Sequence, residues 1–417
     1  MKNIAFILLA FVLFACTSTN STETNLKLVV KNQVDHVHSL AREPMVCEHS
    51  DGTLFVTGYK NDSGTPQLWK SSDGGSSWES VNVGTQEEGA IGNSDVDLFI
   101  DAKGNIYLLS MTYTIIPDNT ENFDFSTTKG ERVVVGVSRD AGESWNWQTI
   151  SENDYDDRPW ITATTDGTLH IIWNDGSGVH RSISKDDGAS WEKVEDVSSV
   201  GGSSFLANGA NGQLAVRITP LSASGFQRDP GVDLIKLSLD NGSTWSDVSI
   251  PGNLDWPEDY SGVPRWVEPI AWDKENRFYS LWSEGQQLKL GVSEDSGSTW
   301  QEFEVMQNVD TMYYPYLEVS DQGLLCTWMS GFTEDVKHNA AVIKVQEDGI
   351  QTYLLEPQTL DVWSRFTSEG FSRSTGGEYF PIIPLANGNF GMATTIQNSK
   401  DNRDGFTWWE LELKEVE

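Results

Sequence analysis

Short runs of hydrophobic residues, separated by glycine-containing turns, recur along most of this 417-residue chain. Seven segments follow one order: a proline or aromatic start, an apolar stretch, a turn and a second apolar stretch. Such runs predict pairs of β-strands joined by a tight turn. We expect these hairpins at 43–59, 94–112, 158–173, 203–217, 266–282, 314–328 and 378–395. No helix of useful length is expected, so the pattern predicts an all-β protein.

A second pattern, Ser-x-Asp-x-Gly-x-[Ser/Thr]-Trp, occurs five times. An aspartate beside glycine can accept the backbone N–H groups of a tight turn while glycine takes positive φ, and the tryptophan can pack beneath. Each copy is therefore expected to form the turn of a hairpin, with too few oxygen ligands for a calcium loop. The copies begin at Ser71, Ser138, Ser184, Ser238 and Ser293. Their structural aspartates are Asp73, Asp140, Asp186, Asp240 and Asp295.

The spacing of these repeats predicts the architecture. Successive copies start 67, 46, 54 and 55 residues apart, and internal periods of this size are typical of a propeller or a similar array. Five of the seven hairpins are followed by a copy, the sixth continues through 340–353 and the last through 406–413. An N-terminal strand at 26–30 can close the ring beside the last blade. We predict one β-propeller of six or seven four-stranded antiparallel blades over 26–417.

The first residues are expected to be a targeting segment outside this fold. Lys2 precedes an apolar run too short to span a bilayer, so 1–15 resembles a secretory signal with a small residue, Ala15, at the cut. Cys16 directly after it resembles the lipobox of bacterial lipoproteins, in which the new N-terminal cysteine is acylated. Residues 16–25, rich in Ser and Thr, would then be a tether to the outer membrane or cell surface. The alternative is an ordinary signal peptide with an incidental cysteine.

Composition narrows the possible partners. The chain has 28 basic and 62 acidic residues, a net charge of −34, which argues against nucleic acid as a partner. Its 17 tryptophans supply ample material for a large core. Three cysteines do not make a disulfide framework, and the six histidines show no metal-binding spacing. We expect a monomer without a metal or other cofactor.

The five repeats resemble the Asp boxes, or bacterial neuraminidase repeats, of the sialidase superfamily, and the resemblance spans nearly all of the mature chain. It implies a propeller and a glycan substrate, although the motif marks the fold more specifically than the activity. In that family an arginine cluster binds the substrate carboxylate, a tyrosine activated by a glutamate is the nucleophile, and an aspartate is the acid/base. Six blades are usual in that family. The seven hairpins of this chain therefore differ from the usual sialidase number and are closer to the blade number of some propeller polysaccharide lyases.

The resemblance implies a role for several residues. Arg42, in Arg-Glu-Pro, resembles the first arginine of the family, and Asp62 best fits the acid/base aspartate. Tyr314, in Tyr-Pro-Tyr-Leu, resembles the nucleophile, and Glu268 is the closest match to its activating glutamate. No arginine stands where the family has its second one. Arg217, which closes a strand one blade earlier, is the alternative for that position.

Blade geometry gives an independent hypothesis. Arg42, Arg158 and Arg265 all lie at the starts of hairpins, which tend to face the same rim of a central funnel. In so acidic a chain, this suggests a pocket for an anion. The alternative is that each arginine bridges neighbouring blades through Asp or Glu. Similar starting positions are occupied by Asp95, Trp160, Tyr313, Tyr314, Glu378 and Tyr379.

Three functions follow. The first is a surface-anchored, sialidase-like glycoside hydrolase acting on carboxylated glycans. The second is a propeller lipoprotein without catalysis that binds a glycan or a protein. The third is a polysaccharide lyase, in which a histidine such as His36 or His38, or a tyrosine, would remove a proton beside an arginine-neutralised uronate.

Overall fold

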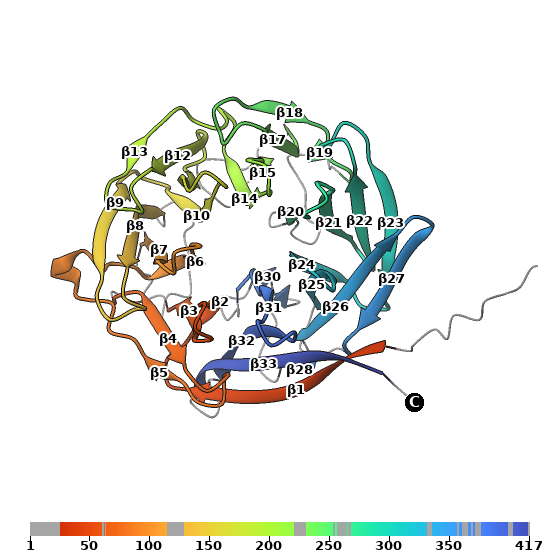
Figure 1. Cartoon of the computed structure of the whole chain (residues 1–417), viewed down its shortest axis with the longest axis horizontal. Coiled ribbons are helices and arrows are strands. Elements are labelled where there is room, and N and C mark those ends of the chain that lie inside the picture. Colours follow the sequence, from red (N-terminus) through yellow and green to blue (C-terminus); the bar gives the residue numbers. More distant parts are fainter. Residues whose placement is uncertain are drawn as a thin grey trace, which may run out of the picture.

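The computed structural model describes residues 26–415, apart from 61, 63, 115–128, 221–230, 253–254, 257–264, 266–267, 332–335, 357, 361–365, 368–369, 372–376 and 399–402. Seven four-stranded antiparallel sheets surround a central channel as the blades of a β-propeller (Figure 1). In each blade the first strand named below is innermost. The prediction of an all-β propeller is therefore confirmed, with seven blades.

Six blades use four strands in near-consecutive order along the chain. Blade one consists of β2 (Arg42–Glu48), β3 (Leu54–Tyr59), β4 (Gln67–Ser71) and β5 (Glu79–Ser80). Blade two consists of β6 (Ser94–Ile100), β7 (Ile106–Tyr113), β8 (Gly130–Ser138) and β9 (Asn146–Ser151). Blade three consists of β10 (Asp157–Ala163), β11 (Leu169–Asn174), β12 (Val179–Ser184) and β13 (Glu192–Lys193). Blade four consists of β14 (Gly202–Asn208), β15 (Leu214–Pro220), β17 (Leu234–Ser238) and β18 (Ser246–Val248). Blade five consists of β20 (Ile270–Trp272), β21 (Phe278–Glu284), β22 (Gln287–Ser293) and β23 (Gln301–Gln307). Blade six consists of β24 (Met312–Ser320), β25 (Gly323–Ser330), β26 (Val336–Gln346) and β27 (Gly349–Leu354).

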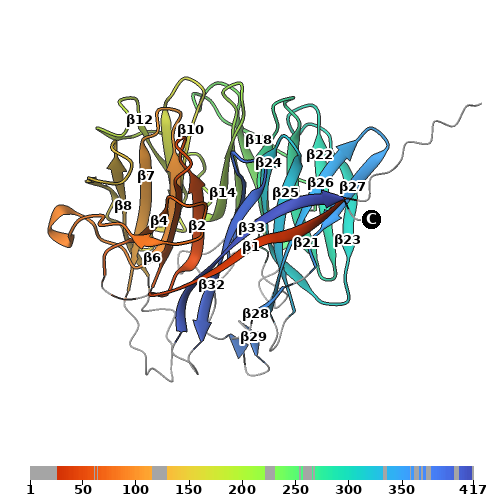
Figure 2. The same ribbon diagram turned by 60° about the horizontal axis from the view of Figure 1, so that its bottom comes forward.

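The seventh blade closes the ring with strands from both ends of the chain. It consists of β31 (Ile382–Pro384), β32 (Phe390–Asn398), β33 (Arg403–Glu415) and, outermost, β1 (Leu26–Val37). β1 and β33 run antiparallel side by side, from the pair Leu26–Glu415 to the pair Val37–Gly405 (Figure 2). The closing strand thus starts where the sequence predicts and extends seven residues further than 26–30.

The few other elements are small. β28 (Gln358–Leu360) pairs with β26, and two short hairpins are formed by β16 (Gly231–Val232) with β19 (Asp255–Trp256) and by β29 (Phe366–Thr367) with β30 (Gly370–Phe371). The one helical turn in the described residues is the 3-10 helix Gln86–Glu88. No described helix is long and apolar enough to cross a membrane.

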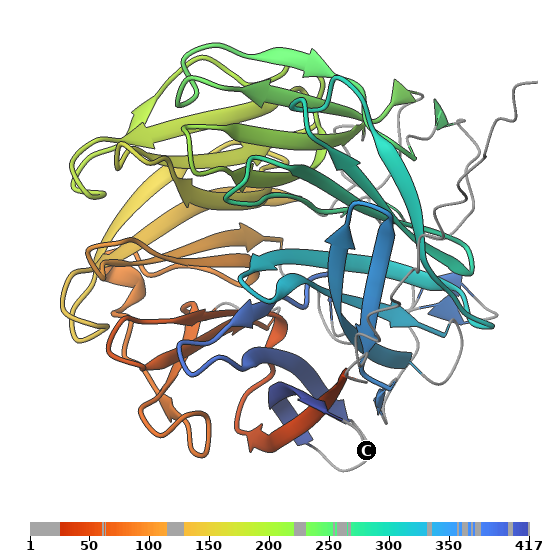
Figure 3. The ribbon, with the colours of Figure 1, turned by 45° about the vertical axis from the view of Figure 1, so that its right-hand side comes forward.

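The sheets pack face to face around the ring (Figure 3). Their buried sides carry mainly Val, Ile, Leu and aromatic residues, the residue types that suit a pleated and buried surface. Five tryptophans are among the largest fully buried side chains and contribute heavily to the core. They are Trp69, Trp173, Trp282, Trp328 and Trp408.

Each Ser-x-Asp-x-Gly-x-[Ser/Thr]-Trp repeat connects the third strand of a blade to the fourth. In the second copy, Ser138 Oγ donates to Asp140 Oδ1 (2.9 Å), and Gly142 N donates to Ser138 Oγ (2.8 Å). Ser144 N also donates to Asp140 Oδ1 (2.9 Å), and the Ser144 hydroxyl donates to Oδ2. These bonds, led by that of the Ser144 hydroxyl, hold the pKa of Asp140 below its usual value. The tryptophans are partly buried against the core beneath the turns.

Candidate functional site

The innermost strands of blades one, three and six share an unusual backbone conformation where they begin. Glu43 (φ 47°), Arg158 (φ 45°) and Tyr314 (φ 50°) lie in the left-handed region, and each is followed by proline. The strand register shifts at each of these places. A non-glycine residue there costs roughly 1–3 kcal/mol and persists only where its surroundings hold it. Backbone strain is therefore repeated at three equivalent positions around the channel.

All three strained residues contact Glu378, which lies in the segment leading into β31 of blade seven. Glu43 Oε1 accepts a hydrogen bond from the Glu378 amide (2.9 Å). Arg158 Nη2 lies 3.2 Å from Glu378 Oε2, and the Tyr314 hydroxyl donates to Glu378 Oε1 at 3.4 Å. The four residues are at most 7% exposed. We call Glu43, Arg158, Tyr314 and Glu378 the Glu378 cluster.

Two further carboxyl groups, on blades two and three, lie beside this cluster. Asp157 Oδ2 is 2.5 Å from Arg158 Nη1, and its side chain is 19% exposed. Burial raises the pKa of Asp157 to about 7, although the Arg158 charge opposes the rise. Burial likewise raises the pKa of Asp95, again against the pull of Arg158. Asp157 is therefore partly protonated at neutral pH, as a general acid needs to be.

A row of aromatic rings leads from the cluster into the channel. Arg158 Nε donates to the Tyr379 hydroxyl (3.0 Å), and the Tyr379 ring meets the Trp160 ring edge-on, with centres 5.0 Å apart. Trp160 in turn contacts Phe205 (5.0 Å), and Phe205 contacts Tyr316 (5.5 Å). This aromatic row joins residues from blades three, four, six and seven, and it includes neighbours of the strained residues Arg158 and Tyr314.

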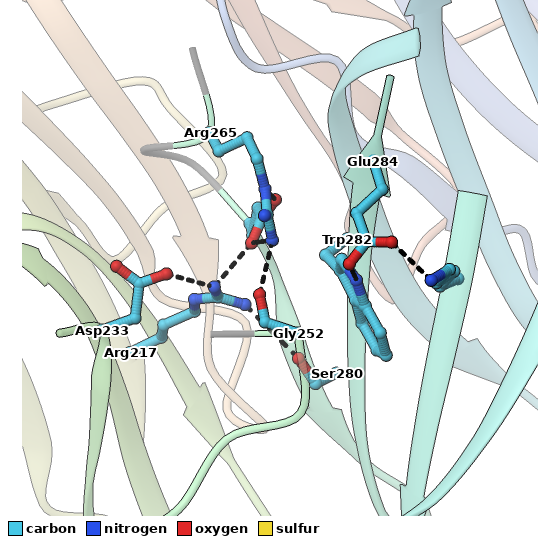
Figure 4. A network of polar contacts seen from close by, with 9 residues as sticks. Arg217, Asp233, Gly252, Arg265, Ser280, Trp282 and Glu284 are labelled. Carbon is cyan, nitrogen blue, oxygen red and sulfur yellow. Dashed lines mark hydrogen bonds and ion pairs between the residues drawn. The ribbon is translucent and has the colours of Figure 1, made fainter. Parts of the chain in front are cut away.

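A second buried network joins blades four and five (Figure 4). Glu268 binds two arginines: Arg217 Nη2 lies 2.5 Å from its Oε2, and Arg265 Nε lies 2.5 Å from its Oε1. Arg217 also pairs with Asp233 (2.9 Å) and lies 3.4 Å from Ser280 Oγ. All four charged side chains are at most 5% exposed. The two positive and two negative charges of this Glu268 network balance one another.

The structure distributes the sequence-derived candidates over several places. It brings Tyr314 to Glu378, whereas Glu268 lies in the network with Arg217 and Arg265. Arg158 belongs to the Glu378 cluster, and the guanidinium carbon of Arg42 lies 6.0 Å from the centre of the Tyr59 ring.

Asp62 and the remaining candidates lie apart from that cluster. Asp62 is 47% exposed, lies 2.6 Å from Lys60 Nζ and accepts a hydrogen bond from the Gly64 amide. Cys16 lies outside the described residues. His36 and His38 stack 5.9 Å apart at the end of β1, on the outer edge of blade seven, so they are not placed as lyase bases in the channel.

The anion pocket expected from Arg42, Arg158 and Arg265 does not form as a set of free cations. Arg158, Arg217 and Arg265 each carry a buried carboxylate partner, which corresponds to the alternative of internally bridged arginines. Among the described residues, no group of three or more His, Cys, Asp or Glu is placed to hold a metal ion.

Sequence reasoning placed Glu378 at a hairpin start without assigning it a role, and it assigned no functional role to Asp157. A usable signal was present. Glu-Pro, Arg-Pro and Tyr-Pro recur at the starts of three hairpins, at 43–44, 158–159 and 314–315. Because proline has no N–H to donate to a neighbouring strand, such repeated pairs mark interruptions of regular strand pairing.

Comparison with known proteins bears on the fold. No protein-family model matches the sequence, and no curated protein matches it. A Dyadobacter fermentans DSM 18053 protein of unknown function is 13% identical, with a TM-score of 0.51 over 93% of this chain and 100% of that one. YCF48 bound to D1 peptide is 11% identical (TM-score 0.50; 91% and 94% covered). The NanB sialidase from Streptococcus pneumoniae is 13% identical (TM-score 0.40; 94% and 71% covered). For the first two proteins, identities this low show a shared fold alone.

Proposed function

We propose that the Glu378 cluster is the active site of a glycoside hydrolase, with Tyr314 and Glu378 as its reacting pair. The observation that carries this proposal is the convergence of three strained residues, from three blades, on one glutamate. Strain of this kind concentrates at functional sites, where it holds side chains in positions that relaxed backbone would not give them. The resemblance of the repeats to Asp boxes supports a glycan as the substrate.

The geometry suits a double displacement. Glu378 accepts the proton of the Tyr314 hydroxyl, and the phenolate oxygen attacks the anomeric carbon. Asp157, with its raised pKa, donates a proton to the departing glycosidic oxygen. In the second half, Asp157 takes a proton from water, whose oxygen displaces Tyr314 and releases the sugar. The departing Tyr314 oxygen takes its proton back from Glu378. Arg158 holds Glu378 and Asp157 in position through its ion pairs.

The substrate class follows from the nucleophile. A neutral tyrosine is not repelled by a carboxylate next to the anomeric carbon, so a sialic-acid-like sugar is the substrate that the resemblance favours. Arg158 would bind the sugar carboxylate by exchanging one of its present carboxylate partners for it.

A second candidate is a propeller without catalysis that binds a glycan or a protein. The observation that favours it is the internal pairing of Arg158, Arg217 and Arg265, which leaves these guanidinium groups engaged within the protein. In that case the ion pairs of the Glu378 cluster and of the Glu268 network stabilise the contacts between neighbouring and opposite blades, and any ligand is bound by other groups.

Turnover of fluorogenic glycosides distinguishes the hydrolase from the propeller without catalysis. We expect release from α-sialosides or another glycoside in a panel that also contains uronides and neutral sugars. Tyr314→Phe and Glu378→Gln should each reduce kcat by at least about 100-fold, the scale of a lost general base or nucleophile. Tyr353→Phe, a matched change on outer strand β27, should leave turnover intact. A folded protein that turns over no glycoside but binds glycans or a protein would establish the second candidate.

We also infer that the propeller is held at a bacterial membrane surface by acylated Cys16, with 16–25 as a tether. The support is the short apolar run that ends at Ala15-Cys16. One acyl chain binds a membrane weakly, so the two or three chains of a lipoprotein are required for stable attachment.

A further inference from the structure

The central channel contains a second feature, distinct from the Glu378 cluster. A cavity of about 300 Å³ is lined by residues from the innermost strands of all seven blades. None of Glu43, Arg158, Tyr314 and Glu378 lines it. Its volume lies at the lower end of the range for small-molecule sites. We call this cavity the channel chamber.

The chamber has negative charge without a matching positive group in its lining. Asp97, on β6, and Glu318, on β24, both line it, and both are partly buried. No Lys, Arg or His is among the described residues that line the chamber. Backbone amides donate hydrogen bonds to both carboxyls: Leu98 N and Ile161 N donate to Asp97 (2.8 and 2.9 Å), and Val319 N donates to Glu318 (3.0 Å).

Aromatic rings also line the chamber. They belong to Trp160, Phe205, Trp272 and Tyr316, and ring faces attract cations through their quadrupoles. Tyr316 lies two residues before Glu318 on β24, so this ring and this carboxyl belong to the same wall.

Burial determines the charge state of the two carboxyls. It raises the pKa of Asp97 to about 7 and also raises the pKa of Glu318. The titratable groups that face these two carboxyls are Cys47 and Tyr316, and burial together with the two carboxylates raises the pKa of each. None of these groups supplies a positive charge to the chamber.

We propose that the channel chamber binds a small organic ammonium ion, such as a quaternary ammonium compound. Asp97 and Glu318 balance its positive charge, and the rings of Trp160, Phe205, Trp272 and Tyr316 contact the carbon groups around its nitrogen. This site is independent of the hydrolase proposed above, because it uses none of the Glu378 cluster.

Calorimetric titration of the mature chain with choline tests the site, with 3,3-dimethyl-1-butanol as a neutral compound of the same shape. We expect choline to bind and the alcohol not to bind. Because a cation binds the ionised carboxyl, raising the pH from about 6 to 8 should tighten choline binding by roughly tenfold as Asp97 loses its proton. Equal binding of the two compounds, no binding of choline at pH 8, or displacement of choline by equimolar Ca²⁺ or Na⁺ would overturn the proposal.

Two substitutions locate the site. Asp97→Asn and Glu318→Gln should each weaken choline binding about tenfold or more, since each removes one of the balancing charges. Asp321→Asn is the matched control, because this carboxylate is 89% exposed in a salt bridge with Lys274 and its removal changes the net charge equally. If both chamber variants unfold, the comparison of choline with its neutral analogue at two pH values still decides the matter in the unmodified protein. Unchanged affinity in folded chamber variants would place the ligand elsewhere.

Discussion

Replacing Glu268 by glutamine separates a structural role from a catalytic one. The carboxylate is 1% exposed and bridges two buried arginines, Arg217 and Arg265, at 2.5 Å each. Glu268→Gln preserves the shape of the side chain but removes its charge. Two guanidinium charges are then left with only Asp233 as a buried counter-charge within the network.

The size of the effect follows from burial. A charge pair about 4 Å apart is worth about 4 kcal/mol at an effective dielectric constant of 20. Removing one partner of a buried pair costs about 3–5 kcal/mol, because the remaining charge stays in the interior without compensation. A loss of that size is a large share of the ~5–15 kcal/mol that stabilises a typical folded protein. We therefore expect a strong reduction in the free energy of unfolding, measured by urea titration with tryptophan fluorescence.

Glu284→Gln provides the control, because Glu284 is 38% exposed in its salt bridge with Lys289 on the same blade. Its loss should cost less than about 1 kcal/mol, as is usual for exposed pairs. Suppose instead that Glu268→Gln matched this control in stability while glycoside turnover disappeared. Glu268 would then act in catalysis, as its resemblance to the activating glutamate of sialidases implies, and the structural reasoning would be refuted.

Three other predictions concern the turns, the response to pH and the anchor. Asp140→Ala removes the acceptor of three hydrogen bonds and should lower the free energy of unfolding by about 1 kcal/mol, a modest value because the turn is exposed; lost turnover at unchanged stability would contradict this. His180 lies 2.9 Å from both Asp175 and Asp196, and the hydrogen bond to Asp175 is the main cause of its raised pKa. Its stabilising effect should be complete below pH 6.5 and fade as the pH rises past the folded-state pKa, so His180→Gln should lower the melting temperature more at pH 6 than at pH 8; an equal loss at both values would exclude this role. Cys16→Ser should release the protein from membranes, and intact mass showing an unmodified N-terminus would rule out the anchor.

Features determined by neighbouring residues could be predicted from the sequence. The hydrogen bonds that join Asp140, Ser138, Gly142 and Ser144 span at most four positions, so the repeat itself defines the turn. The seven hairpins were likewise predictable, because alternation and a turn residue suffice to define two adjacent strands. Counting them limited the number of blades to six or seven, and the structure has seven.

The candidate site could not be predicted in the same way, because its contacts are remote along the chain. Glu378 meets Glu43 across 335 positions and Arg158 across 220. Which side chains meet depends on how the strands of different blades begin, and the left-handed conformations of Glu43, Arg158 and Tyr314 redirect all three. Motif spacing therefore matched Tyr314 with Glu268, although the fold places it against Glu378.

The closure of blade seven by both ends of the chain has a consequence for biosynthesis. β33 begins at residue 403, 366 residues after β1 ends at residue 37. At ~5–20 residues per second, the ribosome needs about 20–70 s to make that stretch. Throughout this time β1 has no partner strand, and an unpaired strand edge invites association with other chains. The ring is thus completed only after β33 has been made, and a truncation before residue 403 would leave both β1 and β32 without the strand that lies between them.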